Sequence, residues 1–269
     1  MSETPKLKSH GRLSISASLI PRDLLTETPR LKAAWRAIIL TLMPDAFPGI
    51  LGQSLTGKAL DMGLWAMDVI NLRAHGIGKH LNVDDTPAGG GAGMVLRADV
   101  LDAALTGAIP DDRLNWPVIY LSPRGQPFTQ ATARRLAAAT GVTLLCGRFE
   151  GIDQRLLDHH QIEEISLGDF VMTGGEIAAM ALIDATVRLL PKVLGNEAST
   201  EEESFSLGLL EHPQYTRPAI WNDLPIPPVL QSGNHGEIAK WRQAQAEEIT
   251  KSRRPDLWAA YQRRLAKGV

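Results

Sequence analysis

The stretch "PVIYLSPRGQPFTQATARRLAAATGVTLLC", residues 117–146, decides the fold class of this chain. Its two apolar runs, at 117–122 and 142–146, are short and bounded by proline, glycine or polar residues, as buried strands are. The segment between them, 129–140, has the pattern of a helix. Alternation of strands and helices predicts an α/β domain with a largely parallel sheet and helices on both faces.

The same alternation extends on both sides of this stretch. An apolar run at 37–42 predicts a further strand, and residues 175–190 predict the longest helix of the alternating region. After about residue 196 the chain becomes polar and acidic, then proline-rich, and finally helical and basic. We therefore expect four parts: a flexible N-terminal extension at 1–34, an α/β domain at 35–196, a mobile linker at 197–208, and a small, mainly helical C-terminal domain at 209–269.

Composition limits the class of protein. The chain has 269 residues, of which 44% are hydrophobic, enough to fill the core of one large domain or two unequal ones. It has no run of 18 apolar residues, so we expect no membrane span. Its first 30 residues lack the apolar stretch of a secretory signal, and its single cysteine, Cys146, excludes an internal disulfide. These features predict a cytoplasmic protein.

The net charge of −2 conceals an uneven distribution. Residues 1–36 carry seven Lys and Arg against three acids, and residues 240–269 carry eight against three. The middle of the chain holds the other 13 of 28 basic and 24 of 30 acidic residues. Two interpretations are open: basic ends that grip a polyanion locally, or ordinary solvated tails and helix faces.

A second glycine-rich stretch, "DDTPAGGGAGM" at 84–94, fits neither familiar phosphate-binding template. A phosphate-binding loop needs a lysine after its last glycine, and here Met94 and Val95 follow. A dinucleotide fingerprint that began at Gly89 would need a glycine at position 94. A structural turn and a loop that approaches some other ligand both remain open.

Three more stretches place glycine near the end of an apparent strand: 120–125, 146–153 and 166–176. In open α/β sheets that edge is where ligands bind. Gly174 and Gly175 also open the long helix, whose free N–H groups favour negative charge. Together the three loops predict a pocket walled by main chain.

These segments and three later ones resemble, in order and spacing, the bacterial tRNA (guanine-N1)-methyltransferase family, TrmD. The segments are DDTPAGGGAGM (84–94), YLSPRG (120–125), CGRFEGID (146–153), SLGDFVMTGGE (166–176), GNEASTEEESF (195–205), YTRP (215–218) and PPVLQSGNHGEIAKWR (227–242). The resemblance implies a SPOUT-class α/β fold with a deep C-terminal trefoil knot, and a homodimer with shared active sites. It implies transfer of a methyl group from S-adenosylmethionine to N1 of guanosine 37 of tRNA, when another guanosine precedes it.

The resemblance also implies a cofactor pocket walled by the three knot loops, in which glycines admit close approach of the ligand. The carboxylate of Glu150 would meet the cofactor's cationic end, although by itself it would be an ordinary surface acid. The cofactor-binding residues so implied are Tyr120, Leu121, Ser122, Gly147, Glu150, Leu167, Gly168, Asp169, Phe170, Val171, Met172, Gly174 and Gly175.

The chemistry needs a base, because guanine N1 carries a proton and is a poor nucleophile until that proton is lost. The family uses a linker aspartate as base and an arginine near the end of the long knot helix. The matching positions here are Glu203 and Arg188, so the base is a glutamate, one methylene longer. Two other interpretations stay open: Glu201 or Glu202 is the base, or the linker is inert.

The substrate and metal assignments come from the same resemblance. They place Asp84, Gly89, Gly90 and Gly91 beside the cofactor and the incoming guanosine, and assign Ser204 and Arg217 to the tRNA. Mg²⁺ is implied as a second cofactor, and Asp84 and Asp85 would either receive it or position the loop. Ala88 and Phe149 stand where relatives have tyrosine, so stacking by position 88 is lost.

Other residues carry weaker signals. His159 and His160 have no partner at metal-ligand spacing, so we expect both at the surface and no protein metal site. Cys146 is expected to be a buried thiol at a strand end, and Trp258 either stacks on RNA or packs in a core. Two other functions remain: a knotted RNA-binding protein that has lost activity through Glu203, or a SPOUT methyltransferase of another nucleotide.

Overall fold

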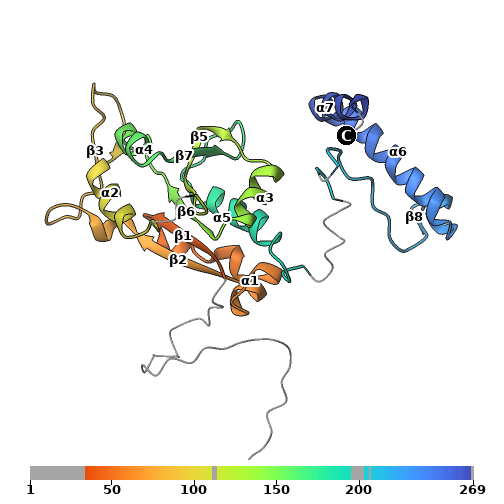
Figure 1. Cartoon of the computed structure of the whole chain (residues 1–269), viewed down its shortest axis with the longest axis horizontal. Helices are drawn as coiled ribbons and strands as arrows, with labels where there is room; N and C mark the ends of the chain where they lie inside the picture. The colour runs from red at the N-terminus through yellow and green to blue at the C-terminus, as the bar shows by residue number, and fades with distance from the viewer. Residues whose placement is uncertain (1–33, 111–113, 195–202, 206, 268–269) are drawn as a thin grey trace, which may run out of the picture. The chain divides into compact units, whose positions relative to one another are not determined.

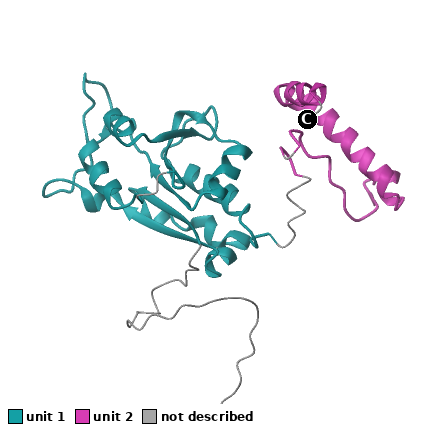
Figure 2. Cartoon of the chain, viewed as in Figure 1, with its two compact units in different colours: residues 1–194 teal, residues 195–269 magenta. Residues whose placement is uncertain are grey.

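The computed structural model describes residues 34–110, 114–194, 203–205 and 207–267 (Figure 1). The expected N-terminal extension and most of the expected linker, with Glu201 and Glu202, lie outside these residues. The chain divides into two compact units between Leu194 and Gly195 (Figure 2). Unit 1 holds the sheet, and unit 2 holds the C-terminal helices.

Unit 1 is built on a five-stranded parallel sheet in the order β2-β1-β6-β5-β7. The strands are β1 (Trp35–Thr41), β2 (Trp65–Asn71), β5 (Val118–Pro127), β6 (Gly141–Cys146) and β7 (Glu163–Ser166). The expected strands at 37–42, 117–122 and 142–146 are confirmed as β1, β5 and β6. β2 is absent from the predicted strands because Asp68 interrupts its apolar pattern. In the structure, the Asp68 carboxylate pairs with Arg36 of β1.

Helices cover both faces of this sheet, as expected. Side chains alternate along β1, so that Ala37 and Ile39 join one apolar cluster while Ile38 and Leu40 join the other. The first cluster is completed by α1 (Ser54–Asp61), α3 (Gln130–Ala138) and α5 (Glu176–Val187), and the second by α2 (Ala98–Thr106) and α4 (Gln154–His160) (Figure 1). Three short 3₁₀ turns lie at Pro44–Ala46, Gly49–Gly52 and Leu72–His75.

Helix α5 starts directly against the end of β6. The Gly175 N–H donates to the Gly147 carbonyl (3.1 Å), and a Cβ at Gly175 would lie 2.8 Å from the Cα of Cys146. A side chain at this position would therefore push the helix away from the strand. The helix ends at Val187, earlier than predicted, because Leu189 and Leu190 form tighter turns that bond to Thr186 and Val187.

Unit 2 is mainly helical in its described residues. It contains α6 (His235–Arg253), α7 (Pro255–Ala266), a 3₁₀ turn at Pro228–Gln231, and a hairpin of β8 (Ile220–Trp221) and β9 (Leu224–Pro225). With 19 residues, α6 is longer than the 12-residue α5. Among the described residues, no helix has the length and apolar character needed to cross a membrane.

Candidate functional site

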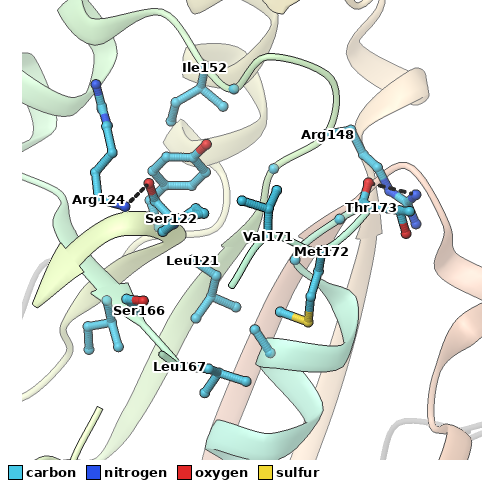
Figure 3. A pocket seen from close by; sticks show the side chains of 18 of the residues that line it. Leu121, Ser122, Arg124, Arg148, Ile152, Ser166, Leu167, Val171, Met172 and Thr173 are labelled. Carbon is cyan, nitrogen blue, oxygen red and sulfur yellow. Dashed lines mark hydrogen bonds between the residues drawn. The ribbon is translucent and has the colours of Figure 1, made fainter. Parts of the chain in front are cut away.

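A cavity of about 340 Å³ lies in unit 1 at the carboxyl ends of β5, β6 and β7 and the start of α5 (Figure 3). Its walls come from the middle of β5, the loop after β6 and the segment between β7 and α5, so the first of the three expected loops is part of a strand. Every residue that the resemblance assigns to the cofactor lines this cavity except Asp169, which is exposed. Other lining residues, which the sequence interpretation did not assign, are Pro123, Arg124, Arg148, Phe149, Gly151, Ile152, Ile165, Ser166, Thr173 and Ala178.

The cavity has apolar and polar walls. Leu121 is nearly buried and lies near Leu167 and Met172, whereas Val171 is 84% exposed (Figure 3). The buried Tyr120 ring faces Gly147, and a Cβ there would lie 2.6 Å from the ring. A side chain at Gly147 would therefore displace the Tyr120 ring, and Gly147 itself lines the cavity. Burial raises the pKa of the Tyr120 hydroxyl, which stays protonated and able to donate at neutral pH.

An ion pair between the half-buried Arg148 and the buried Glu176 joins the loop after β6 to the start of α5. Glu176, in the first turn of α5, accepts from Arg148 Nη2 (2.9 Å) and from the buried Thr41 hydroxyl (2.7 Å). Arg148 Nη1 also donates to the Thr173 carbonyl (3.2 Å). The network ties β1 and the loop after β6 to the start of α5. Sequence analysis did not predict it, although an acid that opens an otherwise apolar helix is a usable signal.

The glycine loop at 84–94 lies beside this cavity. It connects β3 (Asp84–Asp85) with β4 (Val95–Leu96), an antiparallel pair, so the loop is the end of a hairpin. The Glu150 N–H donates to the Met94 carbonyl (2.9 Å), and a Cβ at Gly93 would lie 2.5 Å from Glu150. Gly89, Gly90, Gly91 and Gly93 all have positive φ, between +84° and +126°, which favours glycine.

The acids at the base of the hairpin act on the loop. Asp85 accepts from Arg97 Nη1 (3.2 Å) and from the Thr86 N–H (2.8 Å). Arg97 also donates to Asp99 (2.8 Å), and this bond lowers the pKa of the Asp99 carboxyl. A guanidinium already occupies the place that a cation would take beside Asp85. Of the two sequence interpretations, this arrangement favours positioning of the loop over a Mg²⁺ site.

Arg188 lies at the opposite end of α5 from the cavity. It caps the last turn and is half-buried, whereas Gly175 at the first turn lines the cavity. The 12 residues of α5 span about 18 Å at 1.5 Å per residue. That separation is too great for the Arg188 side chain to reach the cavity of its own chain.

The predicted base lies in unit 2. Glu203 is half-buried and lines a cavity of about 560 Å³, together with Leu207, Leu209, Leu210 and residues of α6. The neighbouring Ser204 hydroxyl accepts from the Glu211 N–H (3.0 Å), and Arg217 is exposed. This cavity was not predicted, because its walls come from segments about 30 residues apart.

Three weaker predictions have clear outcomes. Cys146 is buried at the end of β6, as expected, and its burial raises the pKa of the thiol well above the ordinary value. His159 is exposed as expected, but the surface prediction is wrong for His160, whose side chain is 16% exposed and bonded to Asp102 (2.6 Å). Trp258 is half-buried against Tyr261, with ring centroids 5.6 Å apart.

Comparison with known proteins gives consistent relatives. The sequence profile of the family described as tRNA (Guanine-1)-methyltransferase TrmD matches residues 35–260. Proteins named tRNA (guanine-N(1)-)-methyltransferase are 68% identical in Ruegeria pomeroyi, over 88% of this chain and 98% of the relative, and 69% identical in Cereibacter sphaeroides (strain KD131), over 86% and 94%. The protein of that name from Gluconobacter oxydans is 56% identical, over 85% of this chain and 97% of the relative.

The buried pair at the cavity gives a stability prediction. Arg148→Ala leaves the Glu176 carboxylate buried without its cation, so the free energy of unfolding should fall by about 3–5 kcal/mol. Adding Glu176→Gln removes the buried charge and should recover part of that loss. Urea unfolding measures both variants. Arg155→Ala, which removes an exposed pair with Asp153, is the control and should cost less than about 1 kcal/mol. Equal losses for Arg148→Ala and the control would contradict the prediction.

Proposed function

The chain belongs to the tRNA (guanine-N1)-methyltransferase family, and we propose that it methylates N1 of guanosine 37 of tRNA when another guanosine precedes it. It is therefore a methyltransferase by class. The profile match spans both units, and the relatives are covered over nearly their whole length. The observation that carries the proposal is the cavity at the ends of β5, β6 and β7, because the family's cofactor-binding positions line it.

We propose that this cavity binds S-adenosylmethionine. Its volume lies in the range of about 300–1,000 Å³ that is usual for ligand pockets. Leu121, Leu167 and Met172 offer an apolar surface to an adenine ring, and the Glu150 carboxylate offers a partner for a cationic group. When bound, the cofactor supplies a methyl group on a sulfonium, so the donor needs no further activation. The family resemblance also supports a trefoil knot of the SPOUT class around this cavity.

The protein's own chemistry acts on the acceptor guanine. The Glu203 carboxylate takes the N1 proton, which gives the nitrogen a lone pair for attack. The Arg188 guanidinium then stabilises the negative charge that develops at O6. Alignment of N1 with the methyl group supplies much of the remaining rate enhancement. The half-buried position of Glu203, beside leucine side chains, suits a base that works after water is excluded.

We propose that the active sites are shared between two copies in a homodimer. Arg188 lies about 15 Å along α5 from Ala178, a residue of that helix that lines the cavity, which is farther than its side chain reaches, so we infer that it acts in the cavity of a second copy. The family resemblance supports the same arrangement. Sedimentation equilibrium tests the assembly, and a fully active monomer would overturn it.

We propose that unit 2 binds the tRNA and that the enzyme works in the cytoplasm, where tRNA is processed. Arg217 is exposed, and α6 and α7 end in basic turns that include Lys251, Arg253, Arg263 and Arg264, which suits contact with phosphates. Asp84 and Asp85 do not fit a Mg²⁺ site, because Arg97 pairs with Asp85. No step of the mechanism passes through that ion.

Methyl transfer to defined transcripts tests the function. A tRNA transcript with guanosine at positions 36 and 37 should be methylated at N1 of position 37, as mapped by mass spectrometry. A transcript with adenosine at 36 is the matched control and should react far more slowly. Binding of the transcript without formation of S-adenosylhomocysteine would indicate an inactive RNA-binding protein. A product at another position would indicate a methyltransferase of another nucleotide.

Filling the cavity should block the cofactor without unfolding the protein. Val171 is 84% exposed and lines the cavity, so Val171→Trp adds bulk there and leaves the core intact. We expect the affinity for S-adenosylmethionine, measured by calorimetry, to fall at least about tenfold, or roughly 1.4 kcal/mol. Leu114→Trp is the matched control, since Leu114 is 96% exposed and does not line the cavity. Unchanged affinity in a folded Val171→Trp variant would contradict the proposal that the cofactor binds in this cavity.

Loss of the proposed base should slow chemistry and spare binding. Glu203→Gln keeps the size of the side chain but cannot take a proton, so the single-turnover rate should fall roughly 10²–10⁴-fold. The affinity for S-adenosylmethionine should stay the same. Glu203→Asp should stay active, because the two carboxyl groups have similar basicity. A near-normal rate for Glu203→Gln, together with an inactive Glu202→Gln variant, would indicate that Glu202 is the base.

A further inference from the structure

A second cavity in unit 1 is lined by none of the residues assigned to the cofactor, the base or its arginine. It has a volume of about 1220 Å³ and lies between the β3–β4 hairpin, α2 and α4. Its lining includes four carboxylates against two guanidinium groups, which leaves an excess of two negative charges at neutral pH: Asp85, Asp99, Asp102 and Asp153 against Arg97 and Arg155. Such a lining favours a cation over an anion.

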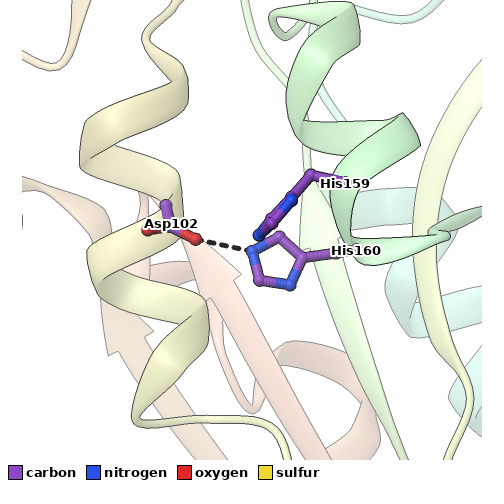
Figure 4. A group of neighbouring side chains, drawn as sticks. All are labelled: Asp102, His159 and His160. Carbon is purple, nitrogen blue, oxygen red and sulfur yellow. Dashed lines mark hydrogen bonds and ion pairs between the residues drawn. The ribbon is translucent and has the colours of Figure 1, made fainter.

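Three side chains that could ligate a metal lie close together at this cavity, of which Asp102 and His159 line it and His160 lies beside them (Figure 4). Asp102 comes from α2, and His159 and His160 come from the last turn of α4. One donor atom from each residue lies within 4.8 Å of the other two. His160 Nε2 lies 2.6 Å from Asp102 Oδ1, and the two imidazole rings are nearly perpendicular, with centroids 4.8 Å apart.

We propose that Asp102, His159 and His160 bind a divalent transition-metal ion such as Zn²⁺. Two imidazoles and one carboxylate suit Zn²⁺ and related ions, whereas Mg²⁺ prefers oxygen donors alone. Tetrahedral geometry with metal–ligand distances of about 2.0–2.1 Å places neighbouring donor atoms about 3.4 Å apart. His160 Nε2 and Asp102 Oδ1, which are 2.6 Å apart, would separate by about 0.8 Å, and rotation of the exposed His159 side chain would bring its nitrogen into range. Cavity water supplies the fourth ligand.

A simple hydrogen bond between the helices accounts for His160 and Asp102 but not for His159. The bond between His160 and Asp102 needs only one imidazole, yet a nitrogen of the second ring lies within 4.8 Å of both bonded atoms. When the ion binds, the proton shared by His160 Nε2 and Asp102 moves to Nδ1 or to water, which frees both donor atoms for the metal.

The ion would hold α2 against α4. Helix α2 follows β4 directly, and α4 follows the segment in which Glu150 bonds to Met94 and Gly151 bonds to Leu96. A clamp between these helices therefore fixes the hairpin that carries the glycine loop. The ion's role is structural, and the inference does not depend on the proposed methyl transfer.

Zn²⁺ titration of the full chain, after treatment with a chelator, tests the site. Calorimetry should give one ion per chain, and the melting temperature should rise with Zn²⁺, because the ion binds only the folded state. His159→Ala removes one ligand and leaves the bond between His160 and Asp102 intact, so it should fold normally. Its Zn²⁺ affinity should fall roughly tenfold or more, and its thermal shift should be lost.

His80→Ala is the matched control, because His80 is exposed in the same unit and outside the cluster; it should bind Zn²⁺ like the wild type. Replacing Zn²⁺ with Co²⁺ gives a second readout, the visible absorption of the tetrahedral ion, which should disappear in His159→Ala and in Asp102→Asn. Equal Zn²⁺ affinity in His159→Ala and wild type would overturn the proposal. Lack of saturable one-to-one Zn²⁺ binding would also overturn the proposal. His160 and Asp102 would then form only a hydrogen bond between the two helices.

Discussion

The burial of one carboxylate, that of Glu176, constrains the edge of the sheet where the first cavity lies. A buried charge is tolerated only when its partners are in place. Here they come from three parts of the chain: Thr41 at the end of β1, Arg148 after β6, and the first turn of α5 itself. The contact of Gly175 with Cys146 then sets how closely the helix approaches the strand. The cavity walls follow from these contacts.

The sequence predicted those parts of the fold whose pattern is local. β1, β5 and β6 are buried and apolar, so their strand character is visible without a partner. β2 contains Asp68, which is acceptable only because Arg36 lies on the neighbouring strand. The early end of α5 depends on tight turns at Leu189 and Leu190 that their apolar character does not signal. Edge strands and helix ends were therefore harder to predict than central strands.

The candidate site divides in the same way. The glycine-rich loops could be predicted, since positive φ and close backbone approach leave a mark on composition. The pairs between Arg148 and Glu176 and between Asp102 and His160 join residues 28 and 58 positions apart, and sequence spacing does not indicate them. Gly147 shows a related limit. The sequence shows that position 147 has no side chain, but not that the Tyr120 ring lies where a Cβ would be.

Because Arg188 lies at the far end of α5, the length of that helix determines where Arg188 lies relative to the cavity. A helix rises 1.5 Å and turns 100° with each residue, at 3.6 residues per turn. One inserted residue would therefore shift Arg188 by about 1.5 Å and rotate it by about 100° relative to the cavity. In the proposed homodimer, the same shift would occur at both shared active sites. The number of residues in α5 therefore sets both the distance and the direction of Arg188 relative to the cavity.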